Sequence, residues 1–320
     1  MKPEHSLPDC RPSTIIVPFA VDPSEATPFT KGSHVARLRA YYRSAIATFW
    51  TLRRFNPGLH CRLATNAELP LWAMRQMACL RVEVEHVEPK AMLQLPTGTT
   101  FRTSLYLFDV VRATLALKGS TVVYLDPDVL CIRPLNLALK DGEIGFLPLG
   151  TGPEDSIKGV TLTQIATARA RSGLPFARHV GGEILMVTPS ALAGLQQGID
   201  EALSGMEGAN RPLFLNEEHV LTYVSDAHWR SLRSEVARVW TSPRYRDVPD
   251  DVGDLALWHL PAEKTRGLAR VYRAVSDGSM DRLPDDDVRR RCRLWTGITP
   301  TTQRRIGDHI AEWFSARRFI

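Results

Sequence analysis

Two aspartates separated by one proline follow a short apolar segment of the chain. Residues 121–125 read Thr-Val-Val-Tyr-Leu, Asp126 and Asp128 flank Pro127, and apolar residues resume at Val129. β-Branched and aromatic residues favour a buried strand, so we expect both carboxylates at the C-terminal end of a strand. From there both can reach one cation, and their hard oxygens suit Mg²⁺ or Mn²⁺.

A cation between two such carboxylates suits the departure of a diphosphate. When the C1–O bond of a nucleotide-sugar breaks, the leaving nucleoside diphosphate gains negative charge, and a bound metal neutralises it as a Lewis acid. That effect is worth several kcal/mol, or ~10³-fold in rate or more at about 1.36 kcal/mol per tenfold. The alternative is a surface turn, because Asp and Pro favour turns, but the apolar residues on both sides favour a buried site.

The segments before Asp126 alternate between strand and helix patterns. We expect strands at 14–19, 61–65 and 81–86, and helices at 38–52 and 103–117. Asn56, Pro57 and Gly58 should stop the first of these helices. Such alternation predicts an α/β fold with a mostly parallel open central sheet flanked by helices. Ligands bind beyond the carboxyl ends of the strands in these sheets, which is where the aspartate pair falls.

The second half of the chain is less regular. We expect strands at 143–147, 183–187 and 255–260, helices at 161–172 and 189–203, and a further helix that begins at Asn216. An Asp-rich stretch at 282–287 suggests a joint. We therefore predict a catalytic domain over residues 1–280 and a basic helical extension over 281–320.

The segment from Tyr124 to Leu130, with Pro134 and Leu135 after it, resembles the metal-binding segment of GT-A fold glycosyltransferases. It is most similar to glycosyltransferase family 8, the group of glycogenin and of bacterial lipopolysaccharide galactosyl- and glucosyltransferases, and the resemblance spans roughly residues 14–267. It implies the nucleotide-diphospho-sugar transferase fold, a UDP-sugar donor, Mn²⁺ or Mg²⁺, and retaining transfer of a hexose to a glycan, lipid-linked or other hydroxyl acceptor.

The resemblance also implies a third metal ligand and a phosphate-binding loop. His259 follows Trp258 and matches the family histidine that completes the metal site with Asp126 and Asp128. Lys264 is similar to the family lysine that contacts the diphosphate, although it stands one place early and the family glycine is missing. The alternative for His259 is a packed core histidine.

Four further residues are implied as donor contacts. Arg112, on the helix before the aspartate pair, is placed like a basic residue that contacts the donor in family 8; a solvated surface arginine is the alternative. Phe19, Ala20 and Asn66 follow the first two strands, where the family binds the base and ribose.

A glycine pair and an acidic pair occupy the remaining motif positions. Gly181 and Gly182 allow close backbone approach to a ligand. Their segment resembles the one that lines the donor sugar in family 8, and the glycine pair itself is more similar to glycosyltransferase family 6. Glu217 and Glu218 resemble an acidic position beneath the anomeric carbon in that family, and either can hold the catalytic role. Helix capping by Asn216 with acidic first-turn residues is the structural alternative.

The net charge of +5 is concentrated near the end of the sequence. Residues 288–320 hold eight arginines, and residues 301–320 fit an amphipathic helix that lies on anionic lipid or packs on the body. The five cysteines are odd in number and form no CxxC pair, which argues against a disulfide framework. We expect a cytoplasmic enzyme with possible peripheral contact at the inner face of a membrane, and no nucleic-acid partner.

Two other functions fit the same motif. The chain is alternatively a non-catalytic pseudoenzyme that binds a nucleotide-sugar, because its lysine loop departs from the family pattern. A DxD phosphohydrolase is the other alternative, although Leu130 stands where that class has Thr or Val, and three expected strands precede the motif instead of none.

Overall fold

The structure is a computed structural model of the 320-residue chain. It describes residues 13–25, 33–117, 121–150, 156–157, 160–171, 173, 178–204, 214–226, 228–242, 245–302 and 306. The basic helix predicted over 301–320 therefore lies outside the described residues except at 301, 302 and 306. Within the described ranges, every helix is too short or too polar to cross a bilayer.

Seven strands form the central sheet. Their order across the sheet is β10 (Arg230–Ser231), β6 (Ile144–Pro148), β9 (Val180–Val187), β4 (Val122–Leu125), β1 (Thr14–Phe19), β2 (His60–Thr65) and β3 (Glu83–His86). All neighbouring pairs are parallel except those of β9, which runs antiparallel to both β4 and β6. The predicted mostly parallel α/β sheet is confirmed. Because β9 is reversed, its first residues lie beside the carboxyl end of β4.

A second sheet of three strands stands at that same end. It consists of β11 (Val236–Arg238), β14 (Leu257–His259) and β5 (Val129–Cys131). The chain passes from β4 of the first sheet to β5 of the second through residues 126–128. Two short hairpins complete the strands, β7 (Ser156–Ile157) with β8 (Val160–Thr161), and β12 (Trp240–Ser242) with β13 (Tyr245–Asp247).

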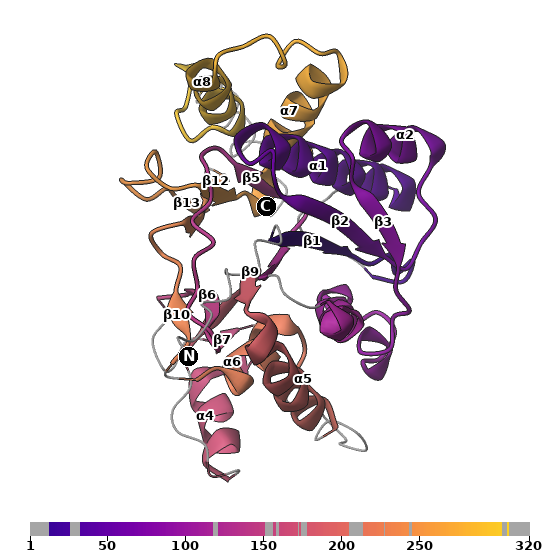
Figure 1. Cartoon of the computed structure of the whole chain (residues 1–320), viewed down its shortest axis with the longest axis vertical. Helices are drawn as coiled ribbons and strands as arrows, with labels where there is room; N and C mark the ends of the chain where they lie inside the picture. The colour runs from indigo at the N-terminus through magenta and orange to yellow at the C-terminus, as the bar shows by residue number, and fades with distance from the viewer. Residues whose placement is uncertain are drawn as a thin grey trace, which may run out of the picture.

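Helices cover both faces of the central sheet (Figure 1). The α-helices are α1 (His34–Phe55), α2 (Leu71–Cys79), α3 (Tyr106–Ala113), α4 (Leu162–Arg171), α5 (Pro189–Ser204), α6 (Glu217–Val224), α7 (Gly267–Ser276) and α8 (Asp285–Thr296). Short 3-10 turns are η1 (Met92–Gln94), η2 (Arg102–Leu105), η3 (Thr114–Ala116) and η4 (Pro261–Glu263). Helices α1, α2, α7 and α8 gather at the top of the view, and α4, α5 and α6 lie at the bottom.

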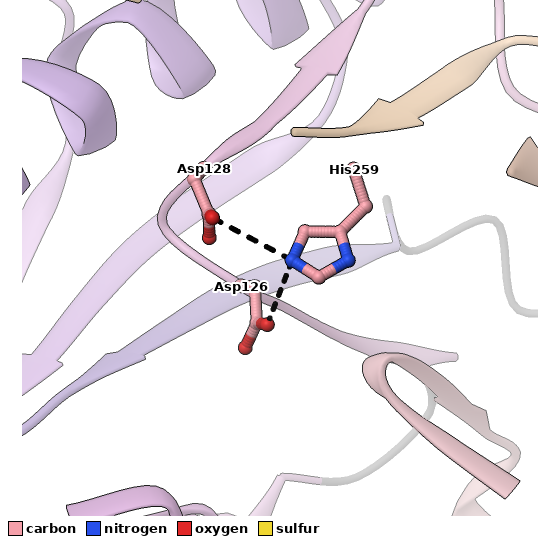
Figure 2. Close-up of side chains that lie close together, drawn as sticks. All are labelled: Asp126, Asp128 and His259. Carbon is pink, nitrogen blue, oxygen red and sulfur yellow. Dashed lines mark ion pairs between the residues drawn. The ribbon is translucent and has the colours of Figure 1, made fainter. Parts of the chain in front are cut away.

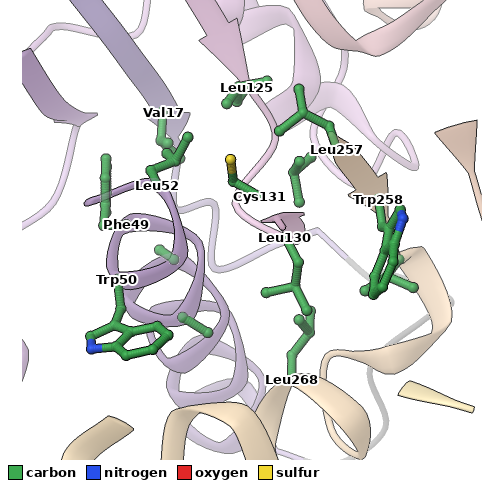
Figure 3. Packing of buried hydrophobic residues seen from close by; sticks show 14 of the residues in the cluster. Val17, Phe49, Trp50, Leu52, Leu125, Leu130, Cys131, Leu257, Trp258 and Leu268 are labelled. Atoms are coloured by element: carbon green, nitrogen blue, oxygen red, sulfur yellow. The ribbon is translucent and has the colours of Figure 1, made fainter. Parts of the chain in front are cut away.

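Alternate residues of the same strand feed two different cores. Ile15 and Val17 of β1 join the cluster that contains α1, while Ile16 between them joins the cluster that contains α3 and α5. Successive side chains of a strand point to opposite faces, so an unbroken apolar run predicts this two-sided burial. Figure 3 shows the first core, where Leu52 of α1 and Leu268 of α7 surround the second sheet.

Helix α1 ends where the sequence predicts. The side chain of Ser33 accepts a hydrogen bond from the Ala36 backbone and caps its start, and Asn56 follows its last residue. The helix predicted over 103–117 is instead divided into η2, α3 and η3. Local hydrogen bonds explain the division, because Ser104 Oγ donates to the Phe101 carbonyl and Phe101 adopts a left-handed φ of 64°.

Helix α8 packs on the main body. Its Val288 and Cys292 are buried in the same core cluster as Leu268 of α7, and Ile298 after the helix joins them. The predicted boundary between 280 and 281 falls in the turn between α7 and α8, and the described residues on both sides of it share one core.

Candidate active site

The backbone of residues 126–128 is held from three sides. The Asp126 amide donates to the Glu183 carbonyl at 3.1 Å, and the Leu260 amide donates to the Asp128 carbonyl at 3.0 Å. Thr48 of α1 donates its hydroxyl to the Pro127 carbonyl at 2.9 Å. These bonds join β9, the end of β14 and α1 to one turn, so both carboxylates have set positions.

His259 brings a nitrogen to the two carboxylates. It is the last residue of β14 and pairs with Val129 across the second sheet. Its Nε2 lies 3.3 Å from Asp126 Oδ2 and 3.5 Å from Asp128 Oδ2 (Figure 2). One ligand atom of each residue lies within 4.8 Å of the others. Two carboxylate oxygens and one imidazole at this spacing fit a divalent metal such as Mn²⁺ or Mg²⁺.

Lys264 lies beside the same cluster. Its ammonium is 5% exposed, pairs with Asp128 Oδ2, and stands 5.2 Å from the centre of the Tyr41 ring. Burial alone would raise the pKa of Asp128, but the charges of Lys264 and His259 outweigh it and hold that pKa well below its usual range. Asp128 is therefore a carboxylate over the whole working pH range.

Asp126 differs from Asp128 although it is two residues away. Burial first, and then the neighbouring carboxylates Asp128, Glu217 and Glu183, raise the pKa of Asp126 to about 7 against the opposing charge of His259. The pKa of His259 is raised to about 10, because the charge of Asp128 and bonds to its neighbours outweigh burial. In the metal-free protein, an imidazolium thus supplies positive charge between the two aspartates.

A buried cluster of opposite charges lies behind His259. Arg238, the last residue of β11, donates to both oxygens of Glu183, with Nε to Oε1 at 2.8 Å and Nη2 to Oε2 at 2.7 Å. Its Nη2 also donates to Glu218 Oε1 at 2.5 Å. Burial opposes ionisation of Glu183, but Arg238 and then His259 lower its pKa to about 2.

Arg238 and Glu183 were not predicted as site residues from the sequence. The signal for Glu183 was present, because an acidic residue inside an apolar strand segment is costly unless it is paired. No comparable signal marks Arg238, whose partners come from segments 20 and 55 positions away.

The two glycines make room for acidic side chains. A Cβ on Gly182 would stand 2.5 Å from Glu217 Oε1 and 2.6 Å from its Cγ, and a Cβ on Gly181 would stand 2.2 Å from Glu183 Oε2. The protein's own carboxylates thus occupy the space beside both glycines. Whether this segment also lines a donor sugar stays a prediction.

Glu217 and Glu218, at the start of α6, lie in different environments. Asn216 caps the helix by accepting from the His219 amide at 3.2 Å, as expected. The Glu217 amide donates to Ser104 Oγ at 3.3 Å, and Glu217 and Gly182 both line a small pocket of about 50 Å³. The Glu218 carboxylate is held by Arg238 and lies 3.8 Å from His179 Nε2.

These groups lie around one cavity of about 460 Å³. Its wall includes Phe19 and Ala20 after β1, the metal-ligand candidates, Glu217, Glu218, Arg238 and Lys264. Asn66 supports this wall, because its side chain accepts from the Val21 amide at 2.7 Å and donates to the Val21 carbonyl at 3.0 Å.

Arg112 is not brought to the cavity. Its guanidinium pairs with Asp200 of α5, and both side chains are about half exposed, at 48% and 46%. This is the surface alternative that the sequence left open for a helix arginine. A donor contact by Arg112 stays an untested prediction.

Solved structures that are similar to this chain include glycosyltransferases. No family model matches the sequence, and no curated protein matches it.

The similar structures include two of the galactosyltransferase LgtC, one an active-site mutant and one in complex with donor and acceptor sugar analogues. They are 14% and 13% identical to this chain, cover 85% of it and 98% of LgtC, and have TM-scores of 0.48 and 0.46. The apo form of glycosyltransferase GlyE from Streptococcus pneumoniae TIGR4 is 11% identical, with 70% of this chain and 45% of GlyE covered and a TM-score of 0.40. Because these identities and TM-scores are low, the activity is inferred from this chain's own site.

Proposed function

We propose that this chain is a metal-dependent retaining glycosyltransferase that takes a hexose from a UDP-sugar. The observation that carries the proposal is the convergence of Asp126, Asp128 and His259 on one wall of a cavity that also contains Glu217. Two sheets and a reversed strand are needed to bring these residues together. The chemistry of the three ligand groups matches a cation that binds a diphosphate.

Asp126, Asp128 and His259 would hold the metal, Mn²⁺ or Mg²⁺. When bound, it supplies neutralising charge to the diphosphate leaving group. Lys264 is already within reach of Asp128, so its ammonium adds a second positive charge on the same side of the cavity. Phe19, the last residue of β1, and Ala20 after it would contact the base and ribose.

We assign the carboxylate beneath the anomeric carbon to Glu217. Glu218 is engaged by Arg238 and faces His179, so its charge is already matched inside the protein. Glu217 also lines a small pocket of about 50 Å³ with Asp126 and Gly182, which Glu218 does not line. Its negative charge suits an oxocarbenium-like state or a transient covalent bond to C1.

Sugar transfer breaks one bond at C1 and forms another. The C1–O bond to the diphosphate breaks and its electron pair leaves with UDP, while the acceptor hydroxyl oxygen forms the new bond to C1. The hydroxyl proton goes to the leaving phosphate oxygen. Binding to Glu217 on one face and acceptor attack from the face of the departing UDP retain the anomeric configuration.

The acceptor in this proposal is a hydroxyl of a glycan or of a lipid-linked saccharide, as in lipopolysaccharide or polysaccharide synthesis. The arginines within 301–320 would hold the enzyme at the cytoplasmic face of an anionic membrane. Sedimentation with vesicles of anionic and of neutral lipid tests this part, and equal binding to both would refute it.

A donor screen tests the central proposal. Binding of the right UDP-sugar raises the unfolding temperature by mass action, in proportion to RT ln(1 + [L]/Kd), and the rise should require Mn²⁺. UDP release with an acceptor should follow. UDP binding without release in any acceptor mixture would identify a pseudoenzyme, and an aspartyl-phosphate on Asp126 would identify a phosphohydrolase.

A further inference from the structure

A buried ion cluster joins the back of His259 to the acidic first turn of α6. Glu183 is fully buried and Glu218 is 8% exposed, and Arg238 donates to both. Replacement of such clusters by apolar side chains is often neutral or stabilising. Stability alone therefore does not account for two carboxylates and a guanidinium at this place.

The carboxylate of Glu183 faces the ring nitrogen of His259 that the aspartates do not use. His259 Nδ1 lies 3.5 Å from Glu183 Oε1, and Nε2 faces Asp126 and Asp128. Figure 2 shows this second nitrogen pointing away from the aspartate pair. An imidazole that gives its Nδ1 proton to a carboxylate presents the lone pair of Nε2 outward, and such a partner sets the tautomer and the ring orientation of a metal ligand.

Arg238 in turn sets the position of Glu183. Two parallel N–H donors hold both carboxylate oxygens of Glu183, which restricts its rotation more than a single bond would. The same guanidinium reaches Glu218, the neighbour of Glu217. One side chain thus connects the support of His259 with the turn that carries Glu217.

We propose that Glu183 and Arg238 are positioning residues of the metal site. Glu183 holds His259 with Nε2 directed at the aspartate pair, and Arg238 keeps Glu183 and the first turn of α6 at a set separation. This inference rests on the metal of the proposed function, but it concerns metal affinity and does not depend on which donor or acceptor is used.

The test measures Mn²⁺ binding to the full chain without donor, by calorimetry and by the electron paramagnetic resonance signal of free Mn²⁺. Glu183→Gln keeps the shape of the side chain and removes its charge, and we expect Mn²⁺ affinity to fall about 10- to 100-fold. Arg238→Lys keeps the charge without the two-pronged geometry, and we expect a smaller fall of severalfold.

The matched control is Arg169→Met. Arg169 of α4 is 2% exposed, while the Arg238 side chain is 22% exposed, and Arg169 packs over the Tyr223 ring outside the cavity wall. We expect its Mn²⁺ affinity to stay within about twofold of wild type. In turnover assays, excess Mn²⁺ should restore much of the rate of Glu183→Gln, which a general loss of structure would not allow.

Wild-type Mn²⁺ affinity in folded Glu183→Gln would overturn the proposal. If that variant does not fold, unchanged affinity in Arg238→Lys overturns it instead. A weakened Glu183→Gln in a protein that turns over no sugar donor would leave positioning intact and defeat the proposed transfer. If wild type turns over a sugar donor but neither binds nor needs Mn²⁺, the positioning proposal is defeated and sugar transfer itself is not.

Discussion

The same change, aspartate to asparagine, should lower the free energy of unfolding strongly at Asp128 and little at Asp126. Asp128 is 2% exposed and pairs with the buried Lys264, so Asp128→Asn leaves an ammonium without its counter-charge. Loss of one partner of a buried pair costs about 3–5 kcal/mol. The Asp126 side chain is 41% exposed and lies among other carboxylates. We therefore expect Asp126→Asn to change the free energy of unfolding by less than about 1 kcal/mol.

The pH dependence of the two proteins should differ in a defined direction. The pKa of Asp126 is raised from 3.8 to about 7 in the folded, metal-free protein. A raised carboxyl pKa stabilises the fold at low pH, and that contribution disappears as the pH rises through about 7. Wild type in EDTA should therefore lose stability relative to Asp126→Asn as the pH rises from about 4 to about 7.

Urea unfolding in EDTA measures these stabilities, and UDP release in Mn²⁺ measures activity. Both variants should lose ~10³-fold in turnover, the size of the metal effect. The double variant Asp128→Asn with Lys264→Met should recover most of the lost stability, because it removes the uncompensated ammonium. Equal unfolding midpoints for Asp126→Asn and Asp128→Asn would refute the reasoning about Lys264, and near wild-type turnover in either would refute the metal site.

Three further outcomes follow from the geometry. Gly182→Ala should displace Glu217 and lower kcat ~10²-fold. The control Gly194→Ala adds a Cβ that meets open space, so it should leave kcat unchanged in the same assay. Equal kcat values for the two variants would contradict the close approach of Gly182 to Glu217. Because the pKa of His259 is raised to about 10, Mn²⁺ binding at pH 8 should release about one proton. Calorimetry in buffers of different ionisation enthalpy measures this release. If no proton is released, the His259 ring does not ligate the metal. Arg112→Ala should leave the donor KM within about twofold, because its guanidinium forms an exposed pair, and a tenfold rise in KM would restore its predicted donor contact.

Periodicity and local chemistry were enough to predict much of this protein. The apolar run before Asp126 predicts a buried strand because β-branched and aromatic residues fill a sheet interior. The sequence likewise predicts the end of α1 at Asn56 and the start of α6 after Asn216, since capping depends on residues a few positions apart. The division of the helix over 103–117 escaped prediction, because the left-handed backbone of Phe101 and the Ser104 bond to its carbonyl are accompanied by a bond from the Thr103 amide to distant Glu25.

The sequence by itself therefore predicted six of the seven strands of the central sheet, all but β10, and two aspartates at the end of one of them. Tertiary structure alone decided what surrounds them. The reversal of β9 places Glu183 beside Asp126, and β14 brings His259 from 131 residues beyond Asp128. Arg238 then pairs with Glu218, which gives the Glu218 carboxylate a different environment from that of Glu217. Such contacts depend on strand order and direction, which are properties of the packed sheet and not of any local stretch of sequence.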